Sequence, residues 1–246
     1  MFYIWTAGFF YKDWIGRFYP ADLPWWEWLK FYAKHFNALE VNSSFYKLPA
    51  KSTIKNYEKV DLTYVFKVPR LFTYFKKYDE NTLNKFYQLL GGLINQNKFW
   101  GLLFQFSASA TKQQVFDCLK FVRKAFKETD FFLELRKLEL IQDFQENEVE
   151  KLKSLNTSLV YVDGKLKNNV LIYEWKDLGF EKCYFRFHGR GEKLYNYLYS
   201  EDELEEFAEK IKKLCKNKEK CFIFFNNTVK AQAVENALKI KEILNF

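Results

Sequence analysis

Eight short apolar runs, recurring about every 30 residues on average, are the feature that most constrains the fold of this chain. Near-continuous apolar strands are typical of a parallel sheet covered on both faces, because such strands are buried on both sides. Amphipathic helical patterns lie in most of the intervals between the runs. The runs are Phe2–Thr6, Ala38–Asn42, Thr63–Val68, Gly101–Gln105, Phe131–Leu135, Ser158–Val162, Cys183–Phe187 and Cys221–Phe225.

This alternation predicts an α/β protein: a single (β/α)8 TIM-type barrel domain over residues 1–246, with some helices short or irregular. Two capping boxes, begun by Thr111 and Ser200, predict the starts of two helices. The interval 169–176 is ambiguous. The competing fold is an open doubly wound sheet, which usually carries a glycine-rich phosphate loop after its first strand. Here the first run is followed by AGFF, which is no such loop.

The charge balance favours an anionic partner. The chain carries 39 Lys and Arg residues against 31 Asp and Glu residues, a net charge of +8 at pH 7. Such a balance suits phosphate compounds or nucleic acid. A lysine-rich solvated surface is the favoured main cause of the excess, so charge alone does not establish such a partner.

The cysteines and the apolar runs bear on the setting of the protein. None of Cys118, Cys183, Cys215 and Cys221 belongs to a C-x-x-C pair, and we expect free thiols in a reducing compartment. The first residues lack the basic region of a secretory signal, and no apolar run approaches the roughly 18 residues that span a membrane. The sequence predicts a soluble cytoplasmic protein without a membrane partner, and it leaves the oligomeric state open.

Polar residues end nearly every predicted strand. In a barrel these ends converge on one mouth, where the active sites of the fold lie. One such residue usually just meets water, but the whole set together predicts a site. The residues are Glu40, Asn42, Ser43, Lys67, Gln105, Glu134, Arg136, Asp163, Arg186, His188, Asn226 and Asn227.

The seventh predicted strand carries the most demanding pattern. Residues two apart share a face of a strand, so Tyr184, Arg186 and His188 point one way, and Phe185 and Phe187 point the other. Two ionisable side chains on one face of an apolar strand are costly to bury without partners. We therefore expect Arg186 and His188 to belong to the site.

The residue types at these strand ends suggest roles. Arginine and lysine bind carboxylates or phosphates, and arginine does so in a bidentate manner. His188 is a candidate general acid/base near neutral pH, and the neutral amides would orient a ligand. The three carboxylates are either acid/base groups or counter-ions that hold the arginines. The cations are Arg186, Arg190, Lys67 and Arg136, the carboxylates Glu40, Glu134 and Asp163, and the amides Gln105, Asn226 and Asn227.

No metal or other cofactor is predicted. The chain has two histidines, His35 and His188, too few for a multi-zinc site. Carboxylate-bound magnesium on Glu40, Glu134 and Asp163 is the less favoured alternative. No G-x-S-x-G motif or strand-end cysteine indicates nucleophilic catalysis.

Basic and aromatic residues alternate in the loops that would follow the strands. Such loops suit single-stranded nucleic acid, whose bases stack on aromatic rings, although packing of the aromatics over the barrel mouth is the more common use. The cluster between Lys210 and Lys220 precedes the last strand, and we interpret it as a solvated surface. The loop residues are Lys12, Arg17, Arg70, Lys76, Lys77, Lys137, Lys165, Lys167 and Lys193, with Phe9, Phe10, Tyr11, Trp14, Phe45, Tyr46, Phe72, Tyr74 and Phe75.

Several motifs together resemble the YecE-like family (domain of unknown function 72). They are TAGFFYKDWIGRFYP, HFNALEVNSSFYKLP, VFKVPR, LLFQF, FFLELR, VDG, YFRFHGR with YNYLYS, and FFNNTVKAQAVENA, which run from residue 6 almost to the C-terminus. The resemblance implies a TIM-type barrel but no established activity. The family's polar positions fall on the strand-end residues above and on Tyr11, Trp14, Tyr46, Arg190, Tyr195 and Tyr197.

The chain departs from the family pattern at three positions. Phe9 stands where the family has tryptophan, no proline follows Gln105, and Lys137 stands where the family has histidine. The last change leaves His188 as the one candidate imidazole at the mouth.

Three functions follow from these patterns. The first is an enzyme, or a degenerate enzyme, that acts on a small anionic or phosphate-bearing ligand, with His188 and a carboxylate in hydrolase- or lyase-type acid/base chemistry. The second is a nucleic-acid binder or metal-independent nuclease that uses the basic and aromatic loops. The third is a binding or scaffold protein whose mouth is sealed by aromatics.

Overall fold

The computed structural model of the chain has the (β/α)8 TIM-type barrel fold that the apolar runs predicted. It describes residues 2–136, 140, 144, 146–166, 169–172 and 175–245, and the side chains at 165, 166 and 169–172 lie outside this description. Lys137, Lys167 and the side chain of Lys165 therefore fall outside what can be assessed. Residues 1–40 and 160–246 form a first compact unit, and residues 41–159 form a second.

Every predicted strand is present, with ends that differ by a few residues. The strands are β1 (Phe2–Thr6), β2 (Ala38–Val41), β3 (Thr63–Lys67), β4 (Phe99–Gln105), β5 (Asp130–Glu134), β6 (Thr157–Leu166), β7 (Asn169–Ile172), β8 (Lys182–Gly189) and β9 (Lys220–Phe225). In the first unit the order is β1–β9–β8–β6, and in the second it is β6–β5–β4–β3–β2; β2 and β6 contribute residues to both. The pairs β1–β9, β9–β8, β8–β6, β6–β5, β5–β4 and β4–β3 are parallel.

Strand β7 resolves the interval that the sequence left ambiguous. It pairs antiparallel with the end of β6, from Asp163 opposite Ile172 to Leu166 opposite Asn169. The chain therefore turns back as a hairpin after β6, in place of a helix, and then continues to β8.

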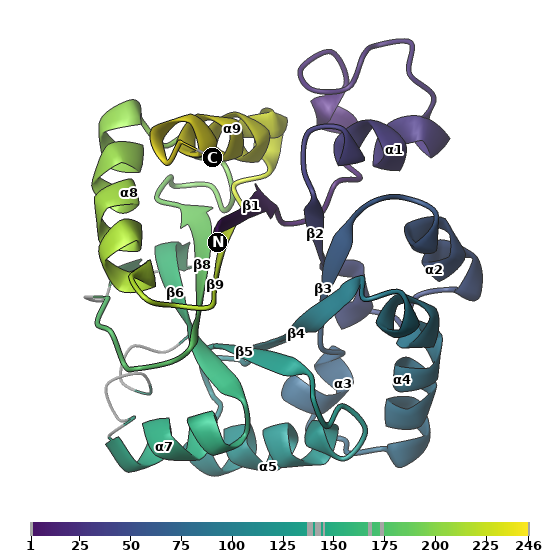
Figure 1. The fold of residues 1–246 in the computed structure, drawn as a ribbon, viewed down its shortest axis with the longest axis vertical. Coiled ribbons are helices and arrows are strands. Elements are labelled where there is room, and N and C mark those ends of the chain that lie inside the picture. The colour runs from purple at the N-terminus through teal and green to yellow at the C-terminus, as the bar shows by residue number, and fades with distance from the viewer. Residues whose placement is uncertain are drawn as a thin grey trace. The chain divides into compact units, whose positions relative to one another are not determined.

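Helices and 3-10 turns occupy the intervals between strands (Figure 1). Both predicted capping boxes are confirmed: Thr111 caps α5 with Gln114, and Ser200 caps α8 with Glu203. Within the first unit α8 packs against α9, and α9 packs against β1. The α-helices are α1 (Trp28–Ala33), α2 (Lys51–Glu58), α3 (Arg70–Thr73), α4 (Glu80–Asn95), α5 (Lys112–Arg123), α7 (Glu146–Ser154), α8 (Glu201–Cys215) and α9 (Gln232–Ile243).

Four short 3-10 helices complete the described structure: η1 (Lys12–Trp14), η2 (Trp25–Glu27), η3 (Ser43–Phe45) and η4 (Val229–Ala231). None of the helices within the described ranges is both long and apolar enough to cross a membrane.

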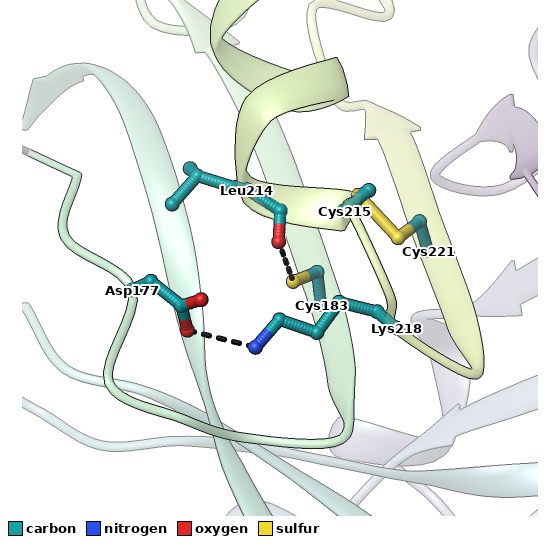
Figure 2. The surroundings of a disulfide bond; sticks show 6 residues. All are labelled: Asp177, Cys183, Leu214, Cys215, Lys218 and Cys221. Carbon is teal, nitrogen blue, oxygen red and sulfur yellow. Dashed lines mark hydrogen bonds and ion pairs between the residues drawn. A yellow bond between two sulfur atoms is a disulfide. The ribbon is translucent and has the colours of Figure 1, made fainter.

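The cysteines correct the expectation of free thiols. Cys215, at the end of α8, and Cys221, near the start of β9, form a disulfide with their Cα atoms 6.1 Å apart. This separation lies within the range that a disulfide can bridge. Cys118 and Cys183 are free and buried. Figure 2 shows that the Cys183 thiol lies beside the disulfide and points to the carbonyl of Leu214.

Candidate functional site

Strand β8 delivers Tyr184 and Arg186 to the same carboxylate. The Nη2 atom of Arg186 lies 2.6 Å from Oε1 of Glu40, and the Tyr184 hydroxyl donates to Oε2 at 2.7 Å. Arg186 is 1% exposed and Glu40 is fully buried. The alternating-face prediction for this strand is confirmed, because Phe185 and Phe187 instead contact Trp175.

Glu40 is held from the backbone side as well. It is the next-to-last residue of β2, where it bridges to Ala7 just after β1, and its carbonyl accepts from the Gly8 amide at 3.0 Å. The carboxylate therefore sits on a fixed backbone, and its two oxygens accept from a guanidinium and a phenol. Such an ion pair is desolvated, so its geometry depends on both partners remaining in place.

His188 lies one pleat beyond Arg186, and it is fully buried. Its Nδ1 atom is 2.8 Å from the side-chain nitrogen of Asn226, which follows β9. The backbone amide of Asn226 donates to the Phe187 carbonyl at 2.7 Å, which extends the β8–β9 ladder and fixes the asparagine. When the amide nitrogen donates to Nδ1, the imidazole is neutral and its proton lies on Nε2.

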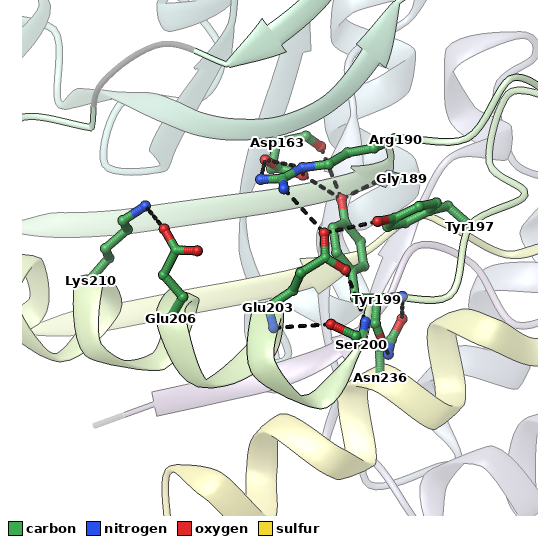
Figure 3. Close-up of polar contacts among 10 residues, drawn as sticks. All are labelled: Asp163, Gly189, Arg190, Tyr197, Tyr199, Ser200, Glu203, Glu206, Lys210 and Asn236. Carbon is green, nitrogen blue, oxygen red and sulfur yellow. Dashed lines mark hydrogen bonds and ion pairs between the residues drawn. The ribbon is translucent and has the colours of Figure 1, made fainter.

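Asp163 and Arg190 form a second charged group, drawn in Figure 3. Arg190 contacts both oxygens of Asp163, with Nη2 at 2.6 Å from Oδ2 and Nε at 3.0 Å from Oδ1, and its Nη1 donates to Glu203 at 3.1 Å. The Tyr199 hydroxyl donates to Asp163 at 2.7 Å, and the Tyr197 hydroxyl donates to Glu203 at 2.8 Å. Burial and the nearby charge of Asp163 raise the pKa of Tyr199 well above its usual value. Two carboxylates and two phenols thus surround one guanidinium.

Two asparagines pin the loop that carries these tyrosines. Asn227 donates to the Tyr197 carbonyl at 2.7 Å and to Oδ1 of Asn236 at 2.8 Å. Asn236, on α9, also accepts from the Tyr199 amide at 3.1 Å and donates to the Tyr199 carbonyl at 2.9 Å. Gly189 begins this loop at φ +87°, and an added Cβ would lie 2.6 Å from that of Tyr197. The close approach therefore requires glycine at this position.

The second unit has a polar relay of its own at the ends of β3, β4 and β5. Lys67 Nζ donates to Oε1 of Gln105 at 2.5 Å, and Gln105 Nε2 donates to Oε1 of Glu134 at 2.6 Å. Arg136 Nε donates to the same Glu134 oxygen at 2.9 Å. Lys67 also lies 4.2 Å from the ring centre of Phe45. A neutral amide thus joins an ammonium group to a carboxylate, and Lys67, Gln105 and Glu134 are all buried.

Other predicted residues make contacts that fit packing. Trp14 is fully buried and donates from Nε1 to the Thr228 carbonyl at 2.7 Å, and the Tyr11 hydroxyl donates to the Ala7 carbonyl at 2.7 Å. Burial is the main cause that raises the pKa of Tyr11 to about 12. In the second unit Asn42 is half-buried, whereas Ser43 and Tyr46 are exposed.

The predicted residues are divided between the two units. The first unit holds Glu40, Asp163, Arg186, His188, Arg190, Tyr197, Asn226 and Asn227, with Tyr11 and Trp14; the second holds Asn42, Ser43, Tyr46, Lys67, Gln105, Glu134 and Arg136. The shared mouth of all these residues remains a prediction. Magnesium on the carboxylates also remains a prediction, and each of the three already accepts from an arginine.

Four contact residues were missed from the sequence. Ser44 donates its hydroxyl to the carbonyls of Val41 and Lys67. Tyr199 and Asn236 hold the loop after β8, and Glu203 was recognised only as a helix cap. An asparagine inside the apolar stripe of α9 was the one available signal for Asn236, because a buried amide requires partners.

Comparisons with known proteins identify relatives along the whole chain. The family described as "Protein of unknown function DUF72" matches residues 3–246. A DUF72 family protein from Thermotoga maritima MSB8 is 29% identical, with 100% of both chains covered and a TM-score of 0.85. A DUF72 family protein from Enterococcus faecalis V583 is 24% identical, with 100% of this chain and 98% of that chain covered and a TM-score of 0.81. No curated protein matches.

Proposed function

This chain belongs to the DUF72 family, as its motifs predicted, and we propose that it is an enzyme that performs acid/base chemistry on a small anionic ligand. One observation carries the proposal: Glu40, Arg186 and His188 lie at the carboxyl ends of strands and are each at most 1% exposed. Active sites of TIM-barrel enzymes lie at this end of the strands. Phosphate and carboxylate groups are the ligands that an arginine site favours.

Stability alone gives a weak reason for this burial. A buried ion pair loses the hydration of both charges, and apolar residues of similar volume are often equally or more stabilising. The Glu40–Arg186 pair, at 2.6 Å, therefore supports a role in binding more than a role in folding. Buried ionisable groups of this kind cluster at functional sites.

We assign the proton transfer to His188. Both oxygens of Glu40 and both oxygens of Asp163 already accept hydrogen bonds, from Arg186 and Arg190 among others. These contacts favour the counter-ion role for the two carboxylates. With Nδ1 facing the Asn226 amide, His188 would carry its proton on Nε2 and donate it to a leaving group, which suits hydrolase- or lyase-type chemistry.

Tyr195 supports a route to the histidine from the surface. Its half-buried ring has its centre 6.0 Å from that of His188. The tyrosine adopts φ +62°, a conformation that costs a residue with a side chain roughly 1–3 kcal/mol and that clusters at ligand clamps. We therefore place Tyr195 next to the ligand, with Arg186 as the cation that recognises it.

Thermal unfolding with a panel of phosphorylated and carboxylated metabolites tests for the ligand. A ligand at 100 times its Kd stabilises the fold by about 2.7 kcal/mol, which corresponds to roughly 5–10 °C in a chain of this length. The proposal predicts such a shift for one class of metabolite. A panel without any shift would contradict it.

Replacement of His188 then tests the chemistry. His188→Gln should reduce turnover of the identified ligand about 10²–10⁴-fold, as loss of a general acid does, while unfolding stays cooperative. His35→Gln is the matched control, because His35 lies just beyond α1 with Nδ1 at 3.0 Å from the Phe31 carbonyl. Unchanged turnover in His188→Gln, with reduced stability, would make the histidine structural.

A second candidate, single-stranded nucleic-acid binding, is supported by a group in the second unit. The exposed Arg70 guanidinium lies 5.4 Å from the ring centres of both Tyr46 and Phe75, which are 67% and 57% exposed. An arginine between exposed rings suits stacking of bases. This function predicts that Tyr46→Ala/Phe75→Ala weakens oligonucleotide binding by about 1–3 kcal/mol per stacked base, whereas Tyr87→Ala on α4 does not. Fluorescence anisotropy at two salt concentrations measures both.

A further inference from the structure

Three cysteines meet at the amino ends of β8 and β9, away from the strand ends that carry His188. Parallel pairing places Cys183 directly opposite Cys221, and α8 ends at Cys215. Their sulfur atoms all lie within 4.8 Å of one another. In Figure 2 the Cys183 thiol lies next to the Cys215–Cys221 disulfide. The disulfide uses two of these residues, and the third sulfur completes a cluster of three.

We propose that, when the disulfide is reduced, Cys183, Cys215 and Cys221 form a binding site for a thiophilic metal ion such as Zn²⁺. Zinc–thiolate bonds of about 2.3 Å in a tetrahedron place sulfur atoms about 3.8 Å apart. Sulfurs already within 4.8 Å reach this arrangement by small side-chain movements. Water fills the fourth position, and soft thiolate ligands select such ions over magnesium or calcium.

The surrounding charge suits this site. Three thiolates and one Zn²⁺ ion carry a net charge of −1, which a neighbouring cation stabilises. Lys218 lies in the loop between Cys215 and Cys221. Its side chain is 10% exposed, and its ammonium group forms an ion pair with Asp177 at 2.8 Å (Figure 2). Part of the lysine cluster between residues 210 and 220 thereby gains a role.

The disulfide and the bound metal ion exclude each other, because both use the sulfur atoms of Cys215 and Cys221. Two equivalents of a thiol reductant convert the Cys215–Cys221 disulfide into two thiols and leave one oxidised reductant disulfide. Binding of Zn²⁺ then releases three protons, one from each cysteine. A small-molecule disulfide takes two electrons from the Cys215 and Cys221 thiolates and leaves as two thiols, which re-forms the protein disulfide, expels the ion and lets Cys183 take up a proton. The site therefore responds to the redox state around it.

Metal binding by the full chain tests the proposal. The protein is reduced with a phosphine and dialysed without oxygen against Zn²⁺ or Co²⁺, and the bound metal is measured. One ion per chain is expected, and Co²⁺ should show thiolate charge-transfer absorption. Cys183→Ser should weaken binding by at least the 10–100-fold that loss of an outer-sphere partner costs. Cys118→Ser is the matched control, because Cys118 lies on α5 in the second unit, and it should bind normally.

A second measurement covers variants that fold poorly. In the reduced wild-type chain, Zn²⁺ should slow alkylation at Cys183, Cys215 and Cys221, as mapped by mass spectrometry, and leave the rate at Cys118 unchanged. Reduced wild-type protein that binds no metal would overturn the proposal. Equal affinity in Cys183→Ser, or protection of Cys215 and Cys221 alone, would overturn the three-sulfur site and leave a simple disulfide.

Discussion

In the unit of residues 1–40 and 160–246 each of two buried carboxylates pairs with an arginine and a tyrosine, whereas in the unit of residues 41–159 the buried carboxylate pairs with an arginine and with an amide that links it to a lysine. Glu40 and Asp163 each accept from one guanidinium and one phenol. Glu134 accepts from Arg136 and from the Gln105 amide, which links it to Lys67. Both arrangements contain a direct ion pair, and the second also contains a neutral link between a lysine and a carboxylate.

This difference predicts how much stability each group of contacts loses when one of its residues is replaced. Removing one member of a desolvated ion pair leaves the other charge buried, a large penalty that removal of both members avoids. Removing a neutral link leaves two charged groups short of one hydrogen bond each, which costs less. Removal of a phenol hydroxyl at the edge of an ion pair costs the least free energy. The three kinds of replacement can therefore be ranked by the free energy of unfolding that each one costs.

The largest effect is expected for Arg186→Met. It leaves Glu40 buried without its guanidinium, and the free energy of unfolding should fall by about 3–5 kcal/mol. The double variant Glu40→Leu/Arg186→Met should recover most of this loss, because no charge is then left unpaired. Urea unfolding of both variants measures the difference.

A surface pair provides the control for this prediction. Lys30 and Glu27 lie 2.9 Å apart with side chains 63% and 36% exposed, so Lys30→Met should cost less than about 1 kcal/mol. Equal losses in Arg186→Met and in the double variant would show that packing, and not the charge of Glu40, accounts for the effect.

An intermediate effect is expected for Gln105→Leu, which breaks the relay of the second unit. Lys67 and Glu134 each lose a short hydrogen bond, and the free energy of unfolding should fall by about 2–3 kcal/mol. Gln113→Leu on α5 is the matched control, because Gln113 is exposed and its side chain donates to Asp117 on the same helix. If Gln105→Leu costs as much as Arg186→Met, the distinction between direct pair and relay is lost.

Much of this comparison was visible in the sequence, and for a physical reason. The alternation of Tyr184, Arg186 and His188 with phenylalanines follows from the pleat of one strand, so the shared face could be predicted without the fold. Strand ends were predicted only approximately from the change to polar side chains, because β6 continues past Asp163 to Leu166 and β8 continues past His188 to Gly189. Local rules of this kind predicted that Glu40, Glu134 and Asp163 end strands, and left their roles open between acid/base group and counter-ion.

Contacts between distant segments could not be predicted in this way. The meeting of Cys183 with Cys221 depends on the register of β8 and β9, and that of Cys215 with both depends on where α8 ends. The second role of Glu203, as a partner of Arg190, likewise depends on the path of the loop after β8. Strand β7 was left ambiguous because a short apolar run after a strand suits a helix or a strand equally.

The smallest loss of stability at neutral pH is expected for Tyr199→Phe, and this loss should change with pH. The hydroxyl donates to Asp163 at 2.7 Å and accepts from the Gly189 amide at 2.9 Å, so its loss should cost about 1 kcal/mol at pH 7. Burial and Asp163 raise the pKa of Tyr199 in the folded chain. Above the unfolded pKa of about 10 the unfolded state loses this proton and the folded state keeps it, so the wild type is destabilised as pH rises.

Phenylalanine does not titrate, so the gap between wild type and Tyr199→Phe should close by about 1.4 kcal/mol per pH unit above pH 10. Near pH 11 the two chains should be about equally stable in urea unfolding, because the hydrogen bond and the titration then offset each other. A gap that stays constant from pH 7 to pH 11 would mean that Tyr199 ionises alike in both states. The Asp163–Arg190 ion pair would then be hydrated enough that folding leaves the ionisation of Tyr199 unchanged.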